Sequence, residues 1–150
     1  MIYRVKDLVI DMRAREWCML PYPRHPKGCP NYGKRKSCPP QAPLITEWAD
    51  LSKPMDFVVI EFNLARHIEK MRQKHPNWSE AQLRCCLYWQ GKVNKLLKDT
   101  TKAYALFCGG KYTMCPEAMG VNVIESARRL GLPIEINPQK KIYKIALISP

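Results

Sequence analysis

Seven cysteines carry the most distinctive chemistry of this 150-residue chain. Three of them, Cys29, Cys38 and Cys115, are followed directly by proline. A proline after a ligating cysteine stiffens the turn and removes a competing amide donor, and the same Cys-Pro step ends the ligand run of bacterial ferredoxins. The odd number of cysteines, in a chain whose amino terminus does not resemble a signal peptide, favours metal ligation or reactive thiols over disulfides. We therefore expect a metal site.

Cys108 and Cys115 enclose the loop CGGKYTMC. Its two adjacent glycines would let the backbone approach a bulky cluster and point amides at the cluster's sulfurs. We expect the loop to leave a strand and enter a helix, whose N-terminus favours thiolates and anionic clusters. The candidate cofactor-binding residues are Cys18, Cys29, Cys38, Cys108 and Cys115. Either Cys18 or Cys108 would be the fourth ligand or a nearby nucleophile.

The identity of the metal follows from the softness of the thiolates and from their spacing. Thiolate-rich sites select zinc or iron-sulfur clusters over magnesium, calcium or manganese. Structural zinc sites usually contain close C-x₂₋₄-C pairs, and this chain has none. The wide spacing favours one [4Fe-4S] cluster, with zinc as the alternative and unligated or reactive thiols as a third reading. If only three thiolates bind a cluster, its open iron can take substrate or sulfide.

We expect most of the remaining cysteines and histidines to lie outside the metal site. Cys85 and Cys86 would point about 100° apart on a helix, so we expect small buried hydrophobic side chains there rather than ligands. His67 and His75 lie on or beside a basic helix and are expected to be solvated. His25, which lies among the cysteines, is a candidate ligand or proton-transfer group.

A proline-rich segment, residues 21–43, must position two of the cysteines. Proline fixes φ and lacks an amide hydrogen, so this segment cannot be regular helix or central strand. We expect an ordered irregular loop held by a metal. Its prolines are Pro21, Pro23, Pro26, Pro30, Pro39, Pro40 and Pro43.

The rest of the chain predicts alternating strands and helices. The apolar runs at Asp56–Phe62, Ala103–Phe107 and Tyr143–Ile148 are typical of strands. Further elements are expected to be a helix over 64–74, a helix from the Ser79–Gln82 capping box to about Thr100, and a helix from Pro116 to an αL Gly131. In the middle helix the expected apolar face is formed by Leu83, Leu87, Val93, Leu96 and Leu97. This order predicts a single α/β domain over residues 1–150, with a small layered sheet.

The formal charge of +12 favours polyanionic partners. Lys34, Arg35 and Lys36 could contact an anionic substrate or RNA beside the cysteines, together with Arg24, Lys27 and Tyr32. A second basic patch is expected at Arg84, Lys92, Lys95 and Lys98, although both patches could equally be solvated faces. Because no apolar run is long enough to span a bilayer, we expect no membrane partner and a cytoplasmic location.

Two stretches resemble a widespread prokaryotic family labelled predicted metal-binding protein. The first combines GCPNYG at 28–33 with SCPP at 37–40, and the second runs from EAMGV at 117–121 to ARRLGLP at 127–133. The resemblance implies an iron-sulfur or related metal site at Cys18, Cys29, Cys38 and Cys115. The cysteine-rich insert that family members often carry before the second stretch is nearly absent, which is consistent with one cluster rather than two.

Three functions remain open. The first is redox or sulfur-transfer chemistry at a cluster, acting on an anionic or RNA substrate. The second is a nucleic-acid-binding module that zinc or a cluster holds together, without catalysis. The third is an electron carrier that docks its basic face on an acidic redox partner. Hydrolase and nucleotide-binding functions gain little support, because no catalytic carboxylate pair, Ser-His-Asp set or phosphate-binding glycine motif is recognisable.

Overall fold

The computed structural model describes residues 1–22 and 25–150, and a four-stranded antiparallel sheet forms its centre. The strands are β1 (Ile2–Val5), β2 (Met55–Asn63), β3 (Lys111–Thr113) and β4 (Lys141–Ser149), in the spatial order β1-β2-β4-β3. The two long strands, β2 and β4, pair over eight residues. The short β3 pairs only with residues 147–149 of β4. Within the described residues, the rest of that β4 edge therefore has no neighbouring strand.

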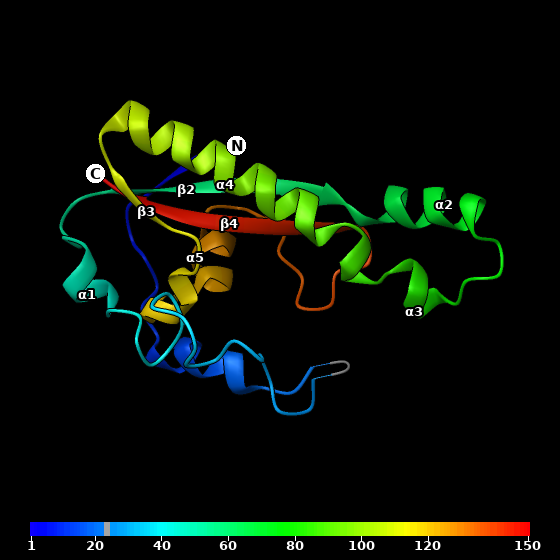
Figure 1. Ribbon diagram of the computed structural model, residues 1–150. Helices are drawn as coiled ribbons and strands as arrows, with labels where there is room; N and C mark the ends of the chain where they lie inside the picture. The colour runs from blue at the N-terminus through cyan, green and yellow to red at the C-terminus, as the bar shows by residue number, and fades with distance from the viewer. Residues whose placement is uncertain (23–24) are drawn as a thin grey trace.

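Helices cover both faces of the sheet. Figure 1 shows α4 above the sheet and α5 below it, while α2 and α3 lie beyond one end. The α-helices are α1 (Ile45–Trp48), α2 (Leu64–Lys74), α3 (Glu80–Leu83), α4 (Gln90–Cys108) and α5 (Val123–Arg129). The 3₁₀ helices are η1 (Met12–Met19), η2 (Cys86–Tyr88) and η3 (Pro116–Met119). The predicted α/β class is confirmed.

The core lies on both sides of the two long strands. On one face, Phe57 and Leu147 are buried with Ala127 of α5. On the other face, Val58 packs in a cluster with Leu97 of α4. A strand that is buried on both faces needs apolar residues at consecutive positions rather than at alternate ones. This explains the unbroken apolar run FVVI at positions 57–60 of β2.

Several elements match the sequence prediction. The strands predicted at Asp56–Phe62 and Tyr143–Ile148 lie within β2 and β4, and the helix predicted over 64–74 is α2. Pro116 begins η3 and Gly131 has a left-handed φ of 83° after α5, as predicted, but the single helix expected between them is wrong, because Gly120 (φ 93°) ends η3 and α5 begins only at Val123. The described residues of 21–43 form turns without a helix or a strand, as expected, although Tyr22 and His25 form an isolated bridge. Pro23, also part of that prediction, lies outside the described residues.

The strand predicted at Ala103–Phe107 is wrong, because α4 continues through this segment to Cys108. The buried positions of α4 recur every four residues, at Val93, Leu97, Thr101 and Ala105. That helical period extends into the predicted strand and decides its structure. Leu106 and Phe107, whose apolar character suggested a strand, are 84% and 87% exposed.

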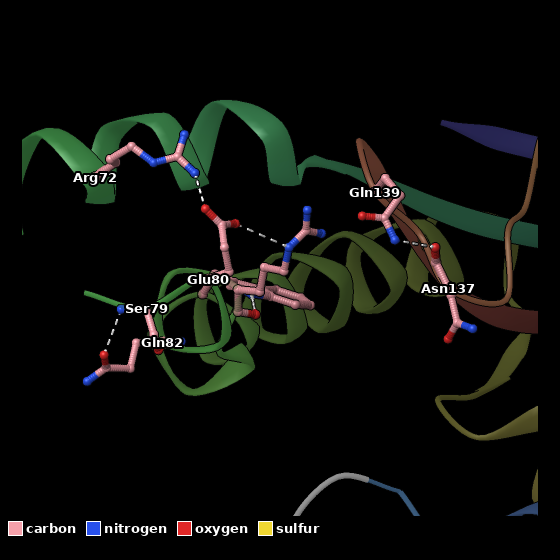
Figure 2. A network of polar contacts seen from close by, with 8 residues as sticks. Arg72, Ser79, Glu80, Gln82, Asn137 and Gln139 are labelled. Atoms are coloured by element: carbon pink, nitrogen blue, oxygen red, sulfur yellow. Dashed lines mark hydrogen bonds and ion pairs between the residues drawn. The ribbon is translucent and has the colours of Figure 1, made fainter. Parts of the chain in front are cut away.

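The single helix predicted from Ser79 to about Thr100 is also wrong. The capping box does form: the Ser79 N–H donates to Gln82 Oε1 (2.9 Å), and the Gln82 N–H donates to Ser79 Oγ (3.3 Å; Figure 2). However, α3 ends at Leu83, and η2 separates it from α4. The break changes the helical phase, so Leu87 and Leu96 are 79% and 54% exposed instead of buried.

The same break exposes a cysteine pair that we expected in the core. Cys85 has an extended ψ of 123° at the start of η2, and it is only partly buried. Cys86 is exposed. The segment is held from α2 instead, because Arg72 forms an ion pair with Glu80 at the start of α3 (Figure 2). The prediction of two small buried side chains is therefore wrong.

Candidate functional site

The candidate site begins where η1 meets the proline-rich loop. The Cys29 N–H donates a hydrogen bond to the Cys18 carbonyl oxygen at 2.6 Å. Gly28, beside them, has a left-handed φ of 79°, and a Cβ placed there would lie 2.5 Å from that same oxygen. Only glycine permits so close an approach of two backbones. These contacts hold Cys18 and Cys29 next to each other.

The loop then folds back on itself around Cys38. The Cys38 N–H donates to the Arg35 carbonyl (3.0 Å), and the Cys38 carbonyl accepts from the Ala42 N–H (2.9 Å). The side chain of Arg15, in η1, donates to the carbonyl oxygens of Pro40 (3.0 Å) and Ala42 (3.1 Å). Hydrogen bonds from η1 therefore anchor the segment that carries Cys38.

Cys115 comes to η1 from a distant part of the sequence. The segment before η1 pairs with the segment after η3: the Asp11 N–H donates to the Gly120 carbonyl, and the Asn122 N–H donates to the Val9 carbonyl, both at 2.8 Å. η1 and η3 also pack against each other. Because Cys115 directly precedes η3, this pairing carries it to the side of the site where Cys18 lies.

The electrostatics of the thiols show that these segments converge. Burial, with further contributions from the charges of Glu117, Cys38 and Cys18, raises the pKa of Cys115 to about 11. Burial also raises the pKa of Cys18, and the charges of Cys29, Cys38 and Glu117 add to the effect. A charge that shifts the pKa of a thiol must lie near that thiol. Together with the hydrogen bonds described above, this places the segments that carry Cys18, Cys29, Cys38 and Cys115 in one region of the fold.

Cys115 combines a large exposed surface with a strongly raised pKa. The residue as a whole is exposed, yet it lines a cavity together with Leu97 and Ile145. Walls of this kind remove water from a thiol without covering the residue, and desolvation disfavours the thiolate. A bound cation would reverse this preference, because metal ligation deprotonates the thiol.

The arrangement of the donors bears on which metal they could hold. In residues 1–22 and 25–150, no group of three or more His, Cys, Asp or Glu side chains is placed to hold a single metal ion. A tetrahedral zinc ion, with Zn–S bonds near 2.3 Å, needs sulfurs within about 4 Å of one another. Four thiolates around a [4Fe-4S] cluster each bind a different iron and stand further apart. The cluster and its alternative, zinc, therefore both stay predictions.

Cys108 is placed differently from the other candidates. It ends α4, is exposed, and its Sγ lies 3.7 Å from the Ala105 carbonyl oxygen. Its charge acts on Tyr104, and no described contact joins it to the four other cysteines. The loop that begins at Cys108 leaves a helix rather than the predicted strand.

The glycine pair after Cys108 also has a role other than the predicted one. Gly109, with a φ of 69°, caps α4 in the left-handed conformation. Gly110 lies against β4, where an added Cβ would meet the Ser149 carbonyl oxygen at 2.7 Å. The pair therefore forms the tight turn from α4 into β3, instead of an approach to a cluster.

The predicted anion-contacting residues lie on the surface of the loop. Lys34, Arg35 and Lys36 are all exposed, and among the described residues none of them forms an ion pair. They stand between Cys29 and Cys38 in the sequence, on a segment that those hydrogen bonds hold in place. Arg24, expected to join them, lies outside the described residues.

The surroundings of the three histidines agree only partly with the sequence prediction. His25 packs its ring 4.5 Å from that of Tyr22, and no described interaction connects it with the thiols. His75 is partly buried and stacks on Trp78 at 3.9 Å. His67 is not fully solvated, because its Nε2 is buried without a hydrogen-bond partner in the described chain.

Two charged residues near the thiols were not singled out from the sequence. Burial raises the pKa of Glu117, while the positive charge of Lys144 and a backbone hydrogen bond oppose the shift. Lys144 also acts on Cys115. The sequence contained a sign of each residue's place near the thiols. Glu117 follows Cys115 by two positions, and Lys144 interrupts the apolar run YKIALI.

Comparison of the chain with protein-family models, curated proteins and solved structures finds no match. The resemblance to the family labelled predicted metal-binding protein therefore stays a prediction. None of the described helices is long and apolar enough to cross a lipid bilayer.

Proposed function

We propose that this protein binds one [4Fe-4S] cluster through Cys18, Cys29, Cys38 and Cys115 and serves in redox or sulfur-transfer chemistry. One observation carries the proposal: hydrogen bonds join the segments that hold Cys18, Cys29 and Cys38, and the packing of η1 against η3 brings the Cys115 segment to them. Unpaired thiols gain nothing from such crowding, whereas a cationic iron centre would stabilise all four as thiolates. Cys18 takes the fourth position in preference to Cys108.

The bound cluster would supply an electron-transfer centre or a Lewis-acidic iron. The chain's own residues would hold it and control access to it. A backbone hydrogen bond holds Cys29 to Cys18 in η1, the side chain of Arg15 anchors the segment around Cys38, and the cavity walls limit water around Cys115. Lys144 places a positive charge beside an anionic thiolate site, where it would favour the ionised ligands.

The proposal also includes a cytoplasmic location and a soluble redox or substrate partner. All seven cysteines are free in the structure. A chain with so many unpaired thiols is better suited to a compartment in which thiols stay reduced. An electron carrier with an acidic partner would use the same site and the same basic surface.

Metal analysis of protein purified without oxygen tests the proposed ligands. We expect roughly four iron and four sulfide per chain and a broad visible absorption, as for a [4Fe-4S] centre. The Cys18→Ser variant should lose most of this iron. Cys108→Ser and Cys86→Ser, matched changes at exposed cysteines outside the site, should retain it. Zinc as the sole metal, or equal iron in all the variants, would contradict the proposal.

The exposed loop charges favour a second candidate, a nucleic-acid-binding module held together by the same site, with a cluster or zinc. Lys34, Arg35 and Lys36 are exposed and next to two of the proposed ligands. Single-stranded nucleic acids bind to such basic segments with a strong dependence on salt. In this case the metal would shape the loop and would take no part in a reaction.

Charge reversal at the loop tests this second candidate. We expect the K34E/R35E/K36E variant to lower both the affinity for a single-stranded RNA and the slope of log K against log salt, by about 2 for three phosphate contacts. The matched triple R66E/K70E/K74E changes exposed residues of α2, outside both expected basic patches, by the same total charge. An equal loss in both triples would indicate attraction by net charge alone and would reject a loop-specific site.

A further inference from the structure

A cavity opens beside the cysteine site, at the part of the β4 edge that β3 leaves uncovered. Its volume is about 590 Å³. Within the described chain, no strand pairs with residues 141–146 on that edge. α4 borders the cavity from one face of the sheet, and η3 and α5 border it from the other. The size is within the usual range for sites that bind small organic molecules.

The walls of the cavity combine apolar side chains with cations. Leu97, Ile142 and Ile145 are among its apolar residues, whereas Lys98 and Lys144 supply positive charge. In the part of the chain that the structure describes, neither lysine takes part in an ion pair. A largely apolar site with a few fixed polar groups selects a ligand of matching polarity. Here the matching polarity is an apolar body with a negative group.

The cavity is continuous with the thiol site. Cys115 and Glu117 line it, and the charge of Lys144 acts on both of them. Lys144 therefore marks the end of the cavity that is next to the proposed ligands. A ligand whose anionic group is held at Lys144 would lie beside Cys115.

We propose that this cavity binds a small organic anion, a carboxylate with an apolar body, with its carboxylate at Lys144 and its apolar part against α4 and β4. The inference that this ligand is the substrate rests on the proposed function, because it places the molecule next to the cysteine site. Binding itself depends only on the cavity.

Equilibrium dialysis with ¹⁴C-labelled octanoate tests the cavity in protein purified anaerobically with its metal. We expect saturable binding of one octanoate per chain, and at least tenfold weaker binding of octanamide, which has the same apolar body without the charge. Lys144→Gln should weaken octanoate binding by roughly tenfold, as for loss of a charge-assisted hydrogen bond. Lys140→Gln, at an exposed position that does not line the cavity, should leave it unchanged.

A cavity-filling change gives an independent test that does not alter charge. Asn94 is an exposed α4 residue that lines the cavity, so Asn94→Trp should fill the space and abolish octanoate binding without disturbing the core. Leu96→Trp, at an exposed α4 position outside the cavity, is the matched control. Unchanged binding in Asn94→Trp, or equal binding of octanoate and octanamide, would overturn the inference.

The two proposals fail in different ways. Normal iron content with no saturable octanoate binding up to about 10 mM would overturn the cavity inference and leave the cluster standing. Octanoate binding in protein that holds no iron would support the cavity and reject the cluster. Retention of binding in Cys18→Ser, with its iron lost, would support the cavity as a preformed pocket.

Discussion

At the scale of single residues, the site depends on Gly28 because two backbones meet there. The residue has a positive φ, and its Cα faces the carbonyl of Cys18 and the backbone of Met19. Both features exclude a side chain. The positive φ would strain the backbone of any other residue, and the nearby backbone of Cys18 and Met19 would overlap with a Cβ atom. Gly33, in the same loop, has the positive φ without any atom within 4 Å of an added Cβ.

This contrast gives a residue-scale prediction. Gly28→Ala should destabilise the protein by more than the roughly 1–2 kcal/mol expected from left-handed strain, because the overlap adds to it. Gly33→Ala should show the strain alone. Urea unfolding would measure both free energies. Equal losses in the two variants would mean that η1 and the loop do not touch at Gly28.

At the scale of elements, two adjacent residues of α4 differ in environment: one lies in the core and the next lies on the surface. Leu97 is buried against the sheet, whereas its neighbour Leu96 is 54% exposed. The rotation of α4 about its own axis therefore determines which of its side chains pack on β2 and β4. That rotation, the helical phase, is set by the break at η2 and by the left-handed cap at Gly109.

The second prediction tests this helical phase with adjacent leucines. Leu97→Ala should lower the free energy of unfolding by about 2–5 kcal/mol, through lost burial and a residual cavity. Leu96→Ala should change it by less than about 0.5 kcal/mol. Thermal and urea unfolding would measure both. If the two losses were similar, the phase of α4 would be incorrect.

The end of the sheet near α2 carries a pH-sensitive group. Burial, and to a smaller extent the positive charge of Lys70, lowers the pKa of His67 from its ordinary value of 6.5. The unfolded chain therefore binds a proton more readily than the folded one between the two pKa values. The stability contributed by neutral His67 is present above pH 6.5 and is lost as the pH falls below it.

The third prediction is that replacement of His67 flattens the pH dependence of stability. Between pH 7 and pH 5, the free energy of unfolding of the His67→Gln variant should fall less steeply than that of the native chain. Lys70→Gln should reduce the slope in part, because it removes only the charge contribution. Urea titrations at several pH values would measure these slopes, and identical slopes for all three proteins would reject the assignment to His67.

At the scale of the whole molecule, the candidate site connects the two ends of the sequence. η1, the described part of the proline-rich loop and η3 meet below the sheet (Figure 1). Little regular secondary structure supports this region, so a bound cluster would add much of its stability. Binding to the folded state alone stabilises a protein by mass action.

The fourth prediction follows from that coupling. Removal of the metal from the native protein should lower its melting temperature by several degrees, because each 1 kcal/mol corresponds to about 2–8 °C for domains of this size range. The Cys18→Ser variant should already melt at the lower temperature and should not respond to removal. Cys108→Ser should behave like the native protein. A melting temperature that does not depend on metal in the native chain would contradict this coupling.

The sequence by itself determined the elements whose signals are local. The short apolar runs FVVI and IALI define β2 and β4, and the pattern over 64–74 defines α2. Prolines exclude helix and strand from the described part of 21–43. The cysteine-proline steps also pointed to three of the four thiols that the structure brings together. In each case, backbone geometry or burial of a few neighbouring residues is sufficient to decide the outcome.

Only the tertiary structure decided which distant segments meet. It separated Cys108 from the other cysteines, extended α4 over the predicted strand at Ala103–Phe107, and placed Glu117 and Lys144 around a cavity. The physical reason is that these outcomes depend on packing between segments more than 20 residues apart. The apolar run AYALF is consistent with a short strand when it is considered alone, but the burial available on one face of β2 and β4 favours the continued helix, with which Ala and Leu are also compatible.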